Sequence, residues 1–253
     1  MYFGRIKMEK LLVIYYHEVV EKGGGNAYQK IEEEKFEEQM RYLFENGYTS
    51  LFFSELGEPL PKKAVIVSFD DGFYSVYEKA APILKKYGIK ANVYLPTAYI
   101  GKEKFMTWEQ VVSLTESGLF EMQAHTHAHV DVRTKDEKGI LDEIEKSSEQ
   151  FLLHGLKLPT AFCFPFGTFD RKSVAALKKT GAYKYLLGSY YGMIGKGVIK
   201  KGGLMARIGI SNNDDMQTFI KKLNGKLNWK GPLQRVRLFL SNLKGQRVEK
   251  YDY

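Results

Sequence analysis

The sequence is short of cysteine and of long apolar runs, and both shortages exclude a class of protein. Cys163 is the single cysteine, so an internal disulfide is excluded, and its apolar surroundings favour an inert buried thiol over a nucleophile. No apolar run approaches the roughly 18 residues of a membrane-spanning helix. Residues 11–16 form an apolar run after Arg5, Lys7 and Lys10, but it is too short for a signal-peptide core. We therefore expect a cytoplasmic protein that meets a membrane, if at all, at the inner face.

Acidic residues are scarce at the C-terminal end of the chain. Residues 196–253 contain 13 of the 38 Lys and Arg residues but only 4 of the 30 Asp and Glu residues. The first 195 residues therefore contain 25 basic and 26 acidic side chains. The formal charge of +8 therefore belongs to this end, which favours an anionic partner. Nucleic acid is not expected, because no recognition motif accompanies the basic residues and aromatics do not alternate regularly with them.

The basic end also carries an amphipathic pattern. Pro232 can begin a helix on which apolar side chains form one face. These apolar side chains are Leu233, Val236, Phe239, Leu240 and Leu243, flanked by Arg235, Arg237 and Lys244. Two interpretations stay open: a terminal helix packed on the main domain, which we favour, or docking of residues 231–253 to an anionic membrane. We expect a catalytic domain over 1–225 and a basic amphipathic tail over 226–253.

The rest of the sequence alternates short apolar runs with amphipathic stretches, which is typical of βα units around a parallel sheet. With 253 residues and 44% hydrophobic content, the chain can bury one large core. Strands are predicted near 11–16, 49–53, 64–69, 91–96, 120–124, 161–165, 184–188 and 204–210. The clearest helices are predicted over 34–45, 75–87 and 136–153. This pattern predicts an α/β fold, a distorted or incomplete (β/α) barrel of about seven units.

Two adjacent carboxylates follow the predicted strand 64–69, in the segment Ser68-Phe69-Asp70-Asp71-Gly72. Side chains of neighbouring residues leave a strand end in different directions, so one carboxylate can bind a metal while the other stays free for proton transfer. Taken alone, this segment is better explained as an ordinary Asp-Gly turn, which is common after strands.

Three histidines, His125, His127 and His129, follow the predicted strand 120–124. Histidines four residues apart can converge on one metal ion. Two imidazoles and one carboxylate would leave an open position for water, which is the arrangement of a catalytic zinc-type site. The alternative is a surface cluster without function.

Placement favours the functional interpretation of both segments. Each lies at the carboxyl end of a predicted strand, and β/α barrels assemble their active sites on that face. His17 follows the strand 11–16, and Pro165-Phe166-Gly167 follows the apolar run ending at Phe164, so both belong to the same face. His154 lies at a helix end, and we interpret it as a surface residue.

These segments together resemble the polysaccharide deacetylases, the NodB-homology group of carbohydrate esterase family 4. Residues 68–72 are similar to the family's Thr/Ser-Phe-Asp-Asp-Gly motif, and His125-Thr126-x-x-His129 is similar to its metal motif. Phe164-Pro165-Phe166-Gly167 is similar to the third motif, and the likeness extends from about Leu11 to Leu223. Tyr16-His17 resembles a branch that includes poly-N-acetylglucosamine deacetylases, in which this strand stands at the N-terminus.

The resemblance implies a distorted barrel and metal-dependent removal of acetyl groups from sugars. Asp71, His125 and His129 would hold a divalent metal, with zinc expected and cobalt or nickel as alternatives. Asp70 would be the general base, and His127 would lie outside the metal shell.

The sequence departs from the family pattern in ways that reassign roles. No histidine follows His154, so the usual C-terminal general acid is absent and His17 takes that role. The arginine that usually precedes the third motif's proline is missing; Arg207 is a candidate partner for Asp70, and a structural ion pair is the alternative. Phe166 replaces a tyrosine, a mild change if its backbone N–H is the group used.

The substrate expected from this resemblance is an N-acetylated sugar of a polysaccharide, oligosaccharide or lipid-linked precursor. Pro165 and Gly167 would shape the substrate site, and Trp108 and Tyr191 are candidates to stack on sugar rings. Two other functions stay open: hydrolysis of another non-peptide C–N bond on the same fold, and a non-catalytic scaffold that binds glycan or membrane.

Overall fold

The computed structural model describes residues 11–24, 28–57 and 59–243. Arg5, Lys7, Lys10 and the tail from Lys244 onward lie outside these ranges. The strands are β1 Leu12–Tyr16, β2 Glu18–Val20, β3 Lys30–Glu32, β4 Thr49–Ser50, β5 Ala64–Phe69, β6 Ala91–Leu95, β7 Phe120–Ala124, β8 Ala161–Cys163, β9 Tyr185–Ser189 and β10 Gly203–Gly209. The helices are α1 Glu33–Glu45, α2 Ala81–Tyr87, α3 Trp108–Glu116, α4 Glu137–Leu153, α5 Arg171–Thr180, α6 Lys196–Lys201, α7 Met216–Leu223 and α8 Lys230–Leu243.

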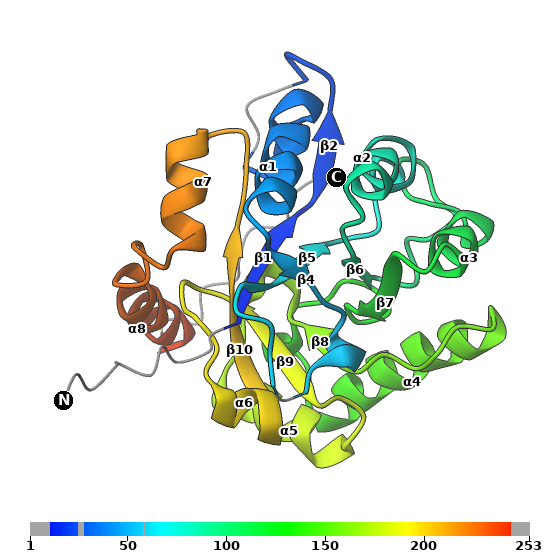
Figure 1. Cartoon of the computed structure of the whole chain (residues 1–253). Coiled ribbons are helices and arrows are strands. Elements are labelled where there is room, and N and C mark those ends of the chain that lie inside the picture. Colours follow the sequence, from blue (N-terminus) through cyan, green and yellow to red (C-terminus); the bar gives the residue numbers. More distant parts are fainter. Residues whose placement is uncertain (1–10, 25–27, 58, 244–253) are drawn as a thin grey trace.

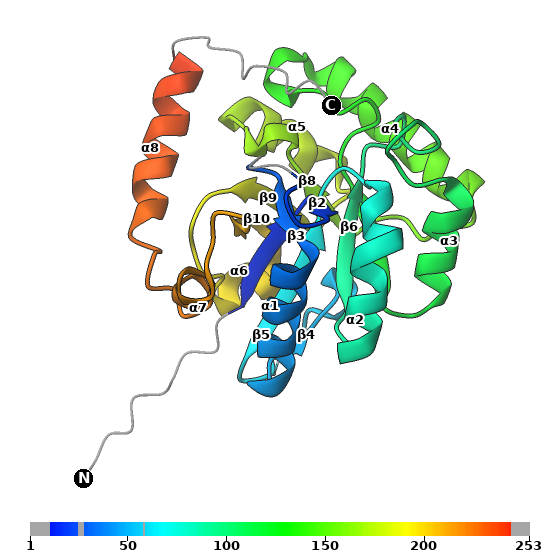
Figure 2. The same cartoon turned by 90° about the horizontal axis from the view of Figure 1, so that it is seen from above.

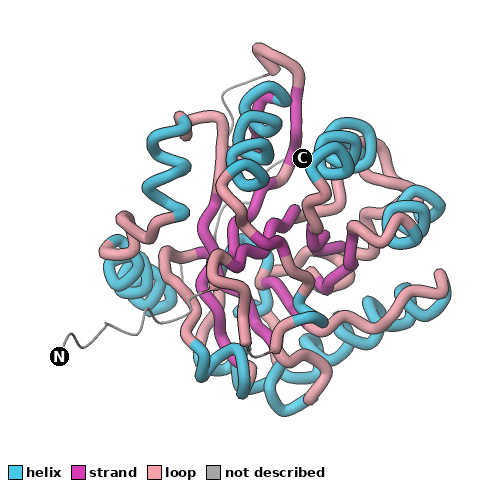
Figure 3. The backbone as a smooth tube through the Cα atoms, viewed as in Figure 1, coloured by secondary structure: helices cyan, strands magenta, loops and turns pink. Residues whose placement is uncertain are grey.

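Seven parallel strands close into a barrel, as the sequence predicts (Figure 1). The ring runs from β1 through β5, β6, β7, β8, β9 and β10 and returns to β1. β1 therefore closes the barrel, pairing with β5 on one side and with β10 on the other. The closure is uneven, because β7 and β8 share one residue pair, Ala124 with Phe162, whereas β1 and β5 pair along five residues. Figure 3 shows the strands inside a shell of helices.

The strand expected over 49–53 is wrong in extent. β4 contains two residues, and the chain then turns into a short 3-10 helix at Phe53–Glu55. β4 pairs with Ala64 and Val65 of β5, whereas β6 pairs with β5 from Val67 onward. β4 therefore pairs with the first residues of β5, which β6 leaves unpaired, and β4 is not part of the closed ring.

The barrel buries both faces of its strands. Every residue of β5 is buried, and its side chains alternate between two apolar clusters. Val65 and Val67 belong to the cluster under α1 and α2, whereas Ile66 belongs to the cluster inside the barrel. Cys163 is a free, fully buried thiol in the inner cluster, as expected.

The last two helices lie on the side of the barrel next to β10 (Figure 2). The expected division after residue 225 falls between α7 and α8. The expected packing of the apolar face of α8 is wrong for the side chains described, because Leu233, Val236, Phe239 and Leu240 are 50 to 62% exposed. Among the described residues, none of the helices has the length and apolar character needed to cross a membrane.

A candidate metal and catalytic centre

The barrel brings the chemically active segments together at the carboxyl ends of its strands. His17 follows β1, the Asp70-Asp71 pair follows β5, His125 and His129 follow β7, and Phe166 follows β8. Arg207 reaches the same place from within β10.

Asp71, His125 and His129 form a compact, buried group. Asp71 Oδ1 lies 3.3 Å from His125 Nε2 and 3.2 Å from His129 Nε2. Their ligand atoms all lie within 4.8 Å of one another, and all three residues are buried. One carboxylate oxygen and two imidazole nitrogens at this separation are a donor set that suits zinc and similar divalent ions.

The hydrogen bonding of His125 orients this residue for metal binding. Its Nδ1 lies 2.8 Å from the carbonyl oxygen of Cys163. A carbonyl oxygen only accepts, so Nδ1 carries a hydrogen, and Nε2, the nitrogen that faces Asp71, is the one available to a metal.

Two of the three residues favour the protonation state that a metal requires. Burial by itself raises the pKa of Asp71, but hydrogen bonds from His125 and His129 together outweigh it and leave the pKa well below the usual range. Burial lowers the pKa of His129, which favours the neutral imidazole that a metal requires. For His125, the neighbouring Cys163 and Asp71 together outweigh burial and raise the pKa, so this residue releases a proton when a metal binds. The three residues therefore fit a divalent ion.

A second group of potential ligands, Asp70, His125 and Cys163, shares one histidine with the first. Burial raises the pKa of the Cys163 thiol, which keeps it protonated, and Asp70 has a different partner. Arg207 Nη1 lies 2.5 Å from Asp70 Oδ1, and Nη2 lies 2.8 Å from Oδ2. Of the two groups, the Asp71 group is therefore the better candidate for a metal site.

The pairing of Asp70 with Arg207 confirms the contact expected from sequence. Both side chains are almost completely buried, and the guanidinium also lies 4.1 Å from the ring centre of Tyr15. Burial by itself raises the pKa of Asp70, but the charge and hydrogen bonds of Arg207, together with His17 and His125, outweigh it and hold the pKa below its ordinary value. Asp70 is therefore an ionised carboxylate at neutral pH, oriented by a two-pronged ion pair.

His17 and Phe166 lie next to these carboxylates. His17 Nε2 is 3.7 Å from Asp70 Oδ2 and 3.9 Å from Asp71 Oδ2, and its side chain is 15% exposed. The ring of Phe166 lies 4.7 Å from that of His129. Both residues line a cavity of about 360 Å³ together with Asp70, Tyr191 and Arg207.

Backbone strain is concentrated at this centre. Five described residues other than glycine have positive φ, and four of them are Asp71, Thr126, His129 and Phe166. Left-handed conformations are costly for side chains with a Cβ and persist where the surrounding structure enforces them. Pro165 and Gly167 are buried beside Phe166; a Cβ on Gly167 would lie 2.3 Å from Ser189 Cβ, so this position requires glycine.

Glu143 is a site residue that the sequence reasoning missed. Its Oε2 accepts hydrogen bonds from the backbone N–H groups of His127 and Ala128, at 2.9 and 2.8 Å. It thereby holds the loop between His125 and His129. The available signal was a carboxylate on the buried face of α4, next to Ile144 and at helical spacing from Ile140.

Of the other residues predicted from the sequence, some line the cavity next to Asp70 and some do not. Tyr191 lines the Asp70 cavity, as a sugar-contacting residue must. Trp108 is not among the residues lining this cavity, and it stacks on His154 with ring centres 4.0 Å apart, so its sugar-binding role stays a prediction. His127 lies outside the Asp71 group, with Nδ1 2.9 Å from Thr97 Oγ1.

Comparison with known proteins identifies the family. The sequence profile described as polysaccharide deacetylase matches residues 57–185, just over half of the chain, and this span contains Asp70, Asp71, His125 and His129. The chain belongs to the polysaccharide deacetylase family. His17 and Arg207 lie outside the matched span, so their placement comes from the barrel geometry.

Relatives of known name support this membership in the polysaccharide deacetylase family. YxkH of Bacillus subtilis, which carries a polysaccharide deacetylase name, is 29% identical over 181 residues, covering 69% of this chain and 63% of that protein. The poly-beta-1,6-N-acetyl-D-glucosamine N-deacetylase of Escherichia coli is 22% identical over an alignment of 290 positions, covering 95% of this chain and 42% of that enzyme. The chain thus spans less than two thirds of the length of either relative.

The fold of this chain also matches that of a solved polysaccharide deacetylase. The crystal structure of a polysaccharide deacetylase from Bacillus cereus superimposes with a TM-score of 0.77 at 26% identity, covering 85% of this chain and 69% of that one. The expected deacetylase-like barrel is confirmed.

Proposed function

We propose that this protein is a metal-dependent hydrolase that removes acetyl groups from N-acetylglucosamine residues of a glycan. The observation that carries the proposal is a metal-ligand group next to a second carboxylate, Asp70, which Arg207 keeps ionised. Binding alone needs no base beside a metal site, whereas amide hydrolysis needs both. Family membership and the name of the Escherichia coli relative support an acetylated glycan as substrate.

In this proposal Asp71, His125 and His129 hold the metal ion. We propose zinc, because two imidazoles and one carboxylate with an open position are typical of catalytic zinc, and cobalt or nickel accept the same donors. When bound, such an ion lowers the pKa of water toward about 7 and polarises a carbonyl group.

The protein's own residues complete the reaction. Asp70 accepts a proton from the attacking water, and Arg207 holds the carboxylate in the required orientation. The backbone N–H of Phe166 donates to the oxyanion that forms on the acetyl carbon. Protonated His17 then donates to the sugar nitrogen as the C–N bond breaks, so that acetate and a free amine are released.

The cavity next to Asp70 is where the sugar would bind. Tyr190 and Tyr191 line it, and aromatic faces of this kind can stack on sugar rings. We propose β-1,6-linked N-acetylglucosamine oligomers as the first substrate to assay, because the Escherichia coli relative is named for that polymer.

The decisive experiment combines metal analysis with acetate release. Asp71→Ala should lose both metal and activity, because it removes the carboxylate shared by both histidines. His17→Ala should retain metal and lose about 10²- to 10⁴-fold in turnover, the usual contribution of a positioned acid. His154→Ala, a histidine stacked on Trp108, should change neither quantity.

The outcomes separate the rival functions. A fully active His17→Ala enzyme would contradict the general-acid assignment. Bound metal without acetate release from any N-acetylated oligomer would favour hydrolysis of another C–N bond. Absence of both metal and acetate release would favour a non-catalytic scaffold.

A further inference from the structure

Helix α8 presents an apolar surface to the outside of the molecule. Leu233 is 62% exposed, Val236 and Phe239 are 57% exposed, and Leu240 is 50% exposed. Trp229, one residue before the helix, is 63% exposed. Large apolar side chains gathered on one helix face and left in contact with water mark an interaction surface.

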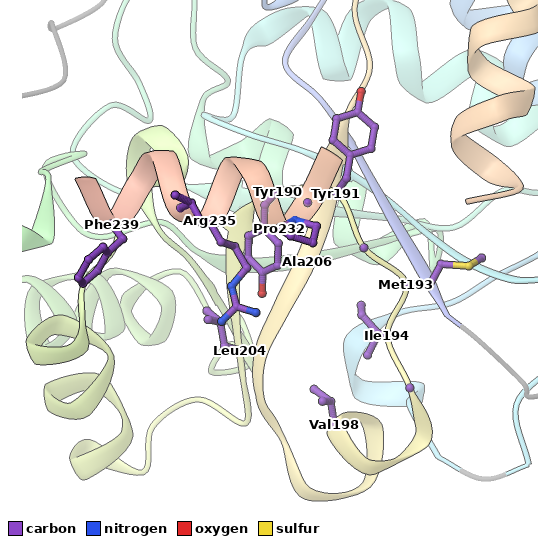
Figure 4. A pocket seen from close by; sticks show the side chains of 14 residues that line it. Tyr190, Tyr191, Met193, Ile194, Val198, Leu204, Ala206, Pro232, Arg235 and Phe239 are labelled. Atoms are coloured by element: carbon purple, nitrogen blue, oxygen red, sulfur yellow. The ribbon is translucent and has the colours of Figure 1, made fainter. Parts of the chain in front are cut away.

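The helix does not close onto the barrel beneath it. A groove of about 600 Å³ separates them, with Pro232, Val236 and Phe239 on one wall and Val198 and Leu204 on the other. Figure 4 shows the side chains of Arg235 and Phe239 directed from α8 toward this groove. The apolar face therefore has no partner among the described residues that would exclude water from it.

The segment that carries this face has charges of one sign. Residues 216–243 contain six Lys and Arg and no Asp or Glu. Of these, Lys221, Lys226, Arg235 and Arg237 are exposed. The last two lie on α8 itself, on either side of the apolar face.

We infer that α8 docks on an anionic lipid bilayer. Leu233 and Leu240 would lie at the boundary between headgroups and acyl chains, while Arg237 would contact lipid phosphates. Arg235 lies over the Tyr190 ring, with its guanidinium carbon 5.7 Å from the ring centre, and would reach a phosphate by turning out of the groove. A second copy of the chain fits this face less well. A symmetric contact sets the same positive charges against each other, whereas an anionic bilayer neutralises them.

Docking would also place the active centre beside the bilayer. Lys230 and Gln234, in the first turns of α8, line the Asp70 cavity, and Gln234 Oε1 accepts a hydrogen bond from the backbone N–H of Tyr191 at 2.8 Å. This step rests on the proposed function. It implies that the acetylated sugar is held at the membrane surface, as on a lipid-linked glycan.

Vesicle flotation of the full chain tests the inference. The protein should float with vesicles of phosphatidylcholine and phosphatidylglycerol, and not with phosphatidylcholine alone. The double variant Leu233→Glu/Leu240→Glu should weaken this binding by at least about tenfold, since it removes two inserted leucines. Arg235→Glu/Arg237→Glu should weaken it by about tenfold or more and reduce its salt dependence.

Matched controls exist elsewhere on the surface. Leu152 and Leu153 on α4 are 62% and 72% exposed, so Leu152→Glu/Leu153→Glu changes two exposed leucines away from α8. Arg171→Glu/Lys172→Glu reverses two exposed charges on α5. Both control variants should float like the wild type.

Three results would overturn the inference: no flotation of the wild type with anionic vesicles, flotation that the Leu233/Leu240 variant retains, or a solution dimer that this variant dissociates without any vesicle binding. Acetate release from a soluble N-acetylglucosamine oligomer, assayed on the Leu233/Leu240 variant and on both control variants, should not change. If that activity is absent from the wild type as well, it is the proposed function that fails and not the docking.

Discussion

Asp70 and Asp71 are neighbours in sequence but have different partners. Asp70 faces the guanidinium of Arg207, whereas Asp71 faces two imidazoles. Both have a pKa below the ordinary value despite burial, so both stabilise the fold while ionised. That contribution is present above the ordinary aspartate pKa of about 3.9 and is lost as the pH falls through the folded pKa values.

Replacing Arg207 should change the pH dependence of catalysis. In Arg207→Met, the largest contribution that offsets burial is lost, so the pKa of Asp70 should rise. Because the base acts in its ionised form, the acid limb of the profile of kcat/KM against pH should move to higher pH. The buried carboxylate left unpaired should also cost about 3 to 5 kcal/mol of stability.

Arg207→Lys is the matched variant, because it keeps a positive charge and loses the two-pronged geometry. The acid limb of its profile of kcat/KM against pH should move less than that of Arg207→Met. Acid limbs unchanged in both variants would show that the ion pair is structural and does not tune the base.

At the scale of elements, α4 supports the loop that follows β7. The loop has positive φ at Thr126 and His129, and Glu143 accepts two of its backbone N–H groups. A strained loop needs external hydrogen bonds to keep one conformation. In the proposed metal site, Glu143 would therefore be a positioning residue, because it would act on the metal through the histidines whose loop it holds.

Glu143→Ala should weaken zinc affinity by about 10- to 100-fold, as is usual when a group that orients metal ligands is removed. Glu143→Gln should weaken it less, since an amide oxygen still accepts the two hydrogen bonds. Competition with a chromogenic chelator measures the affinity. Glu145→Ala, at an exposed position on the same helix, is the control, and an equal loss there would refute the positioning role.

At the scale of the whole molecule, metal binding should stabilise the barrel, because the proposed ligands come from the segment after β5 and from the loop after β7. A free metal concentration of 100 times Kd contributes about 2.7 kcal/mol. For a domain of this size, that raises Tm by about 5 to 10 °C.

A thermal scan with and without zinc measures this shift. Asp71→Ala should abolish it, and Asp142→Ala, an exposed carboxylate on α4, should retain it. A shift that persists in Asp71→Ala would place the ion at another site.

The barrel and most of its active centre could be predicted from the sequence. Residues that are close in sequence stay close in the folded chain, so the Asp70-Asp71 pair and the His125–His129 segment were recognisable as units. Their position after apolar runs put them on one face, because parallel strands of a β/α barrel end together. Helices such as α1 and α4 follow from apolar periodicity and from the residues that end them.

Tertiary structure decided the features that depend on barrel closure. Arg207 meets Asp70 across 137 positions because β1 brings β5 and β10 together as neighbours on its two sides. Glu143 contacts the metal loop because α4 folds back on β7, and periodicity could not distinguish a carboxylate with that partner from one without it. The exposed face of α8 likewise depends on what surrounds the helix. Local chain physics determines which segments form and where side chains point along them, whereas contacts between distant segments depend on how the ring of strands closes.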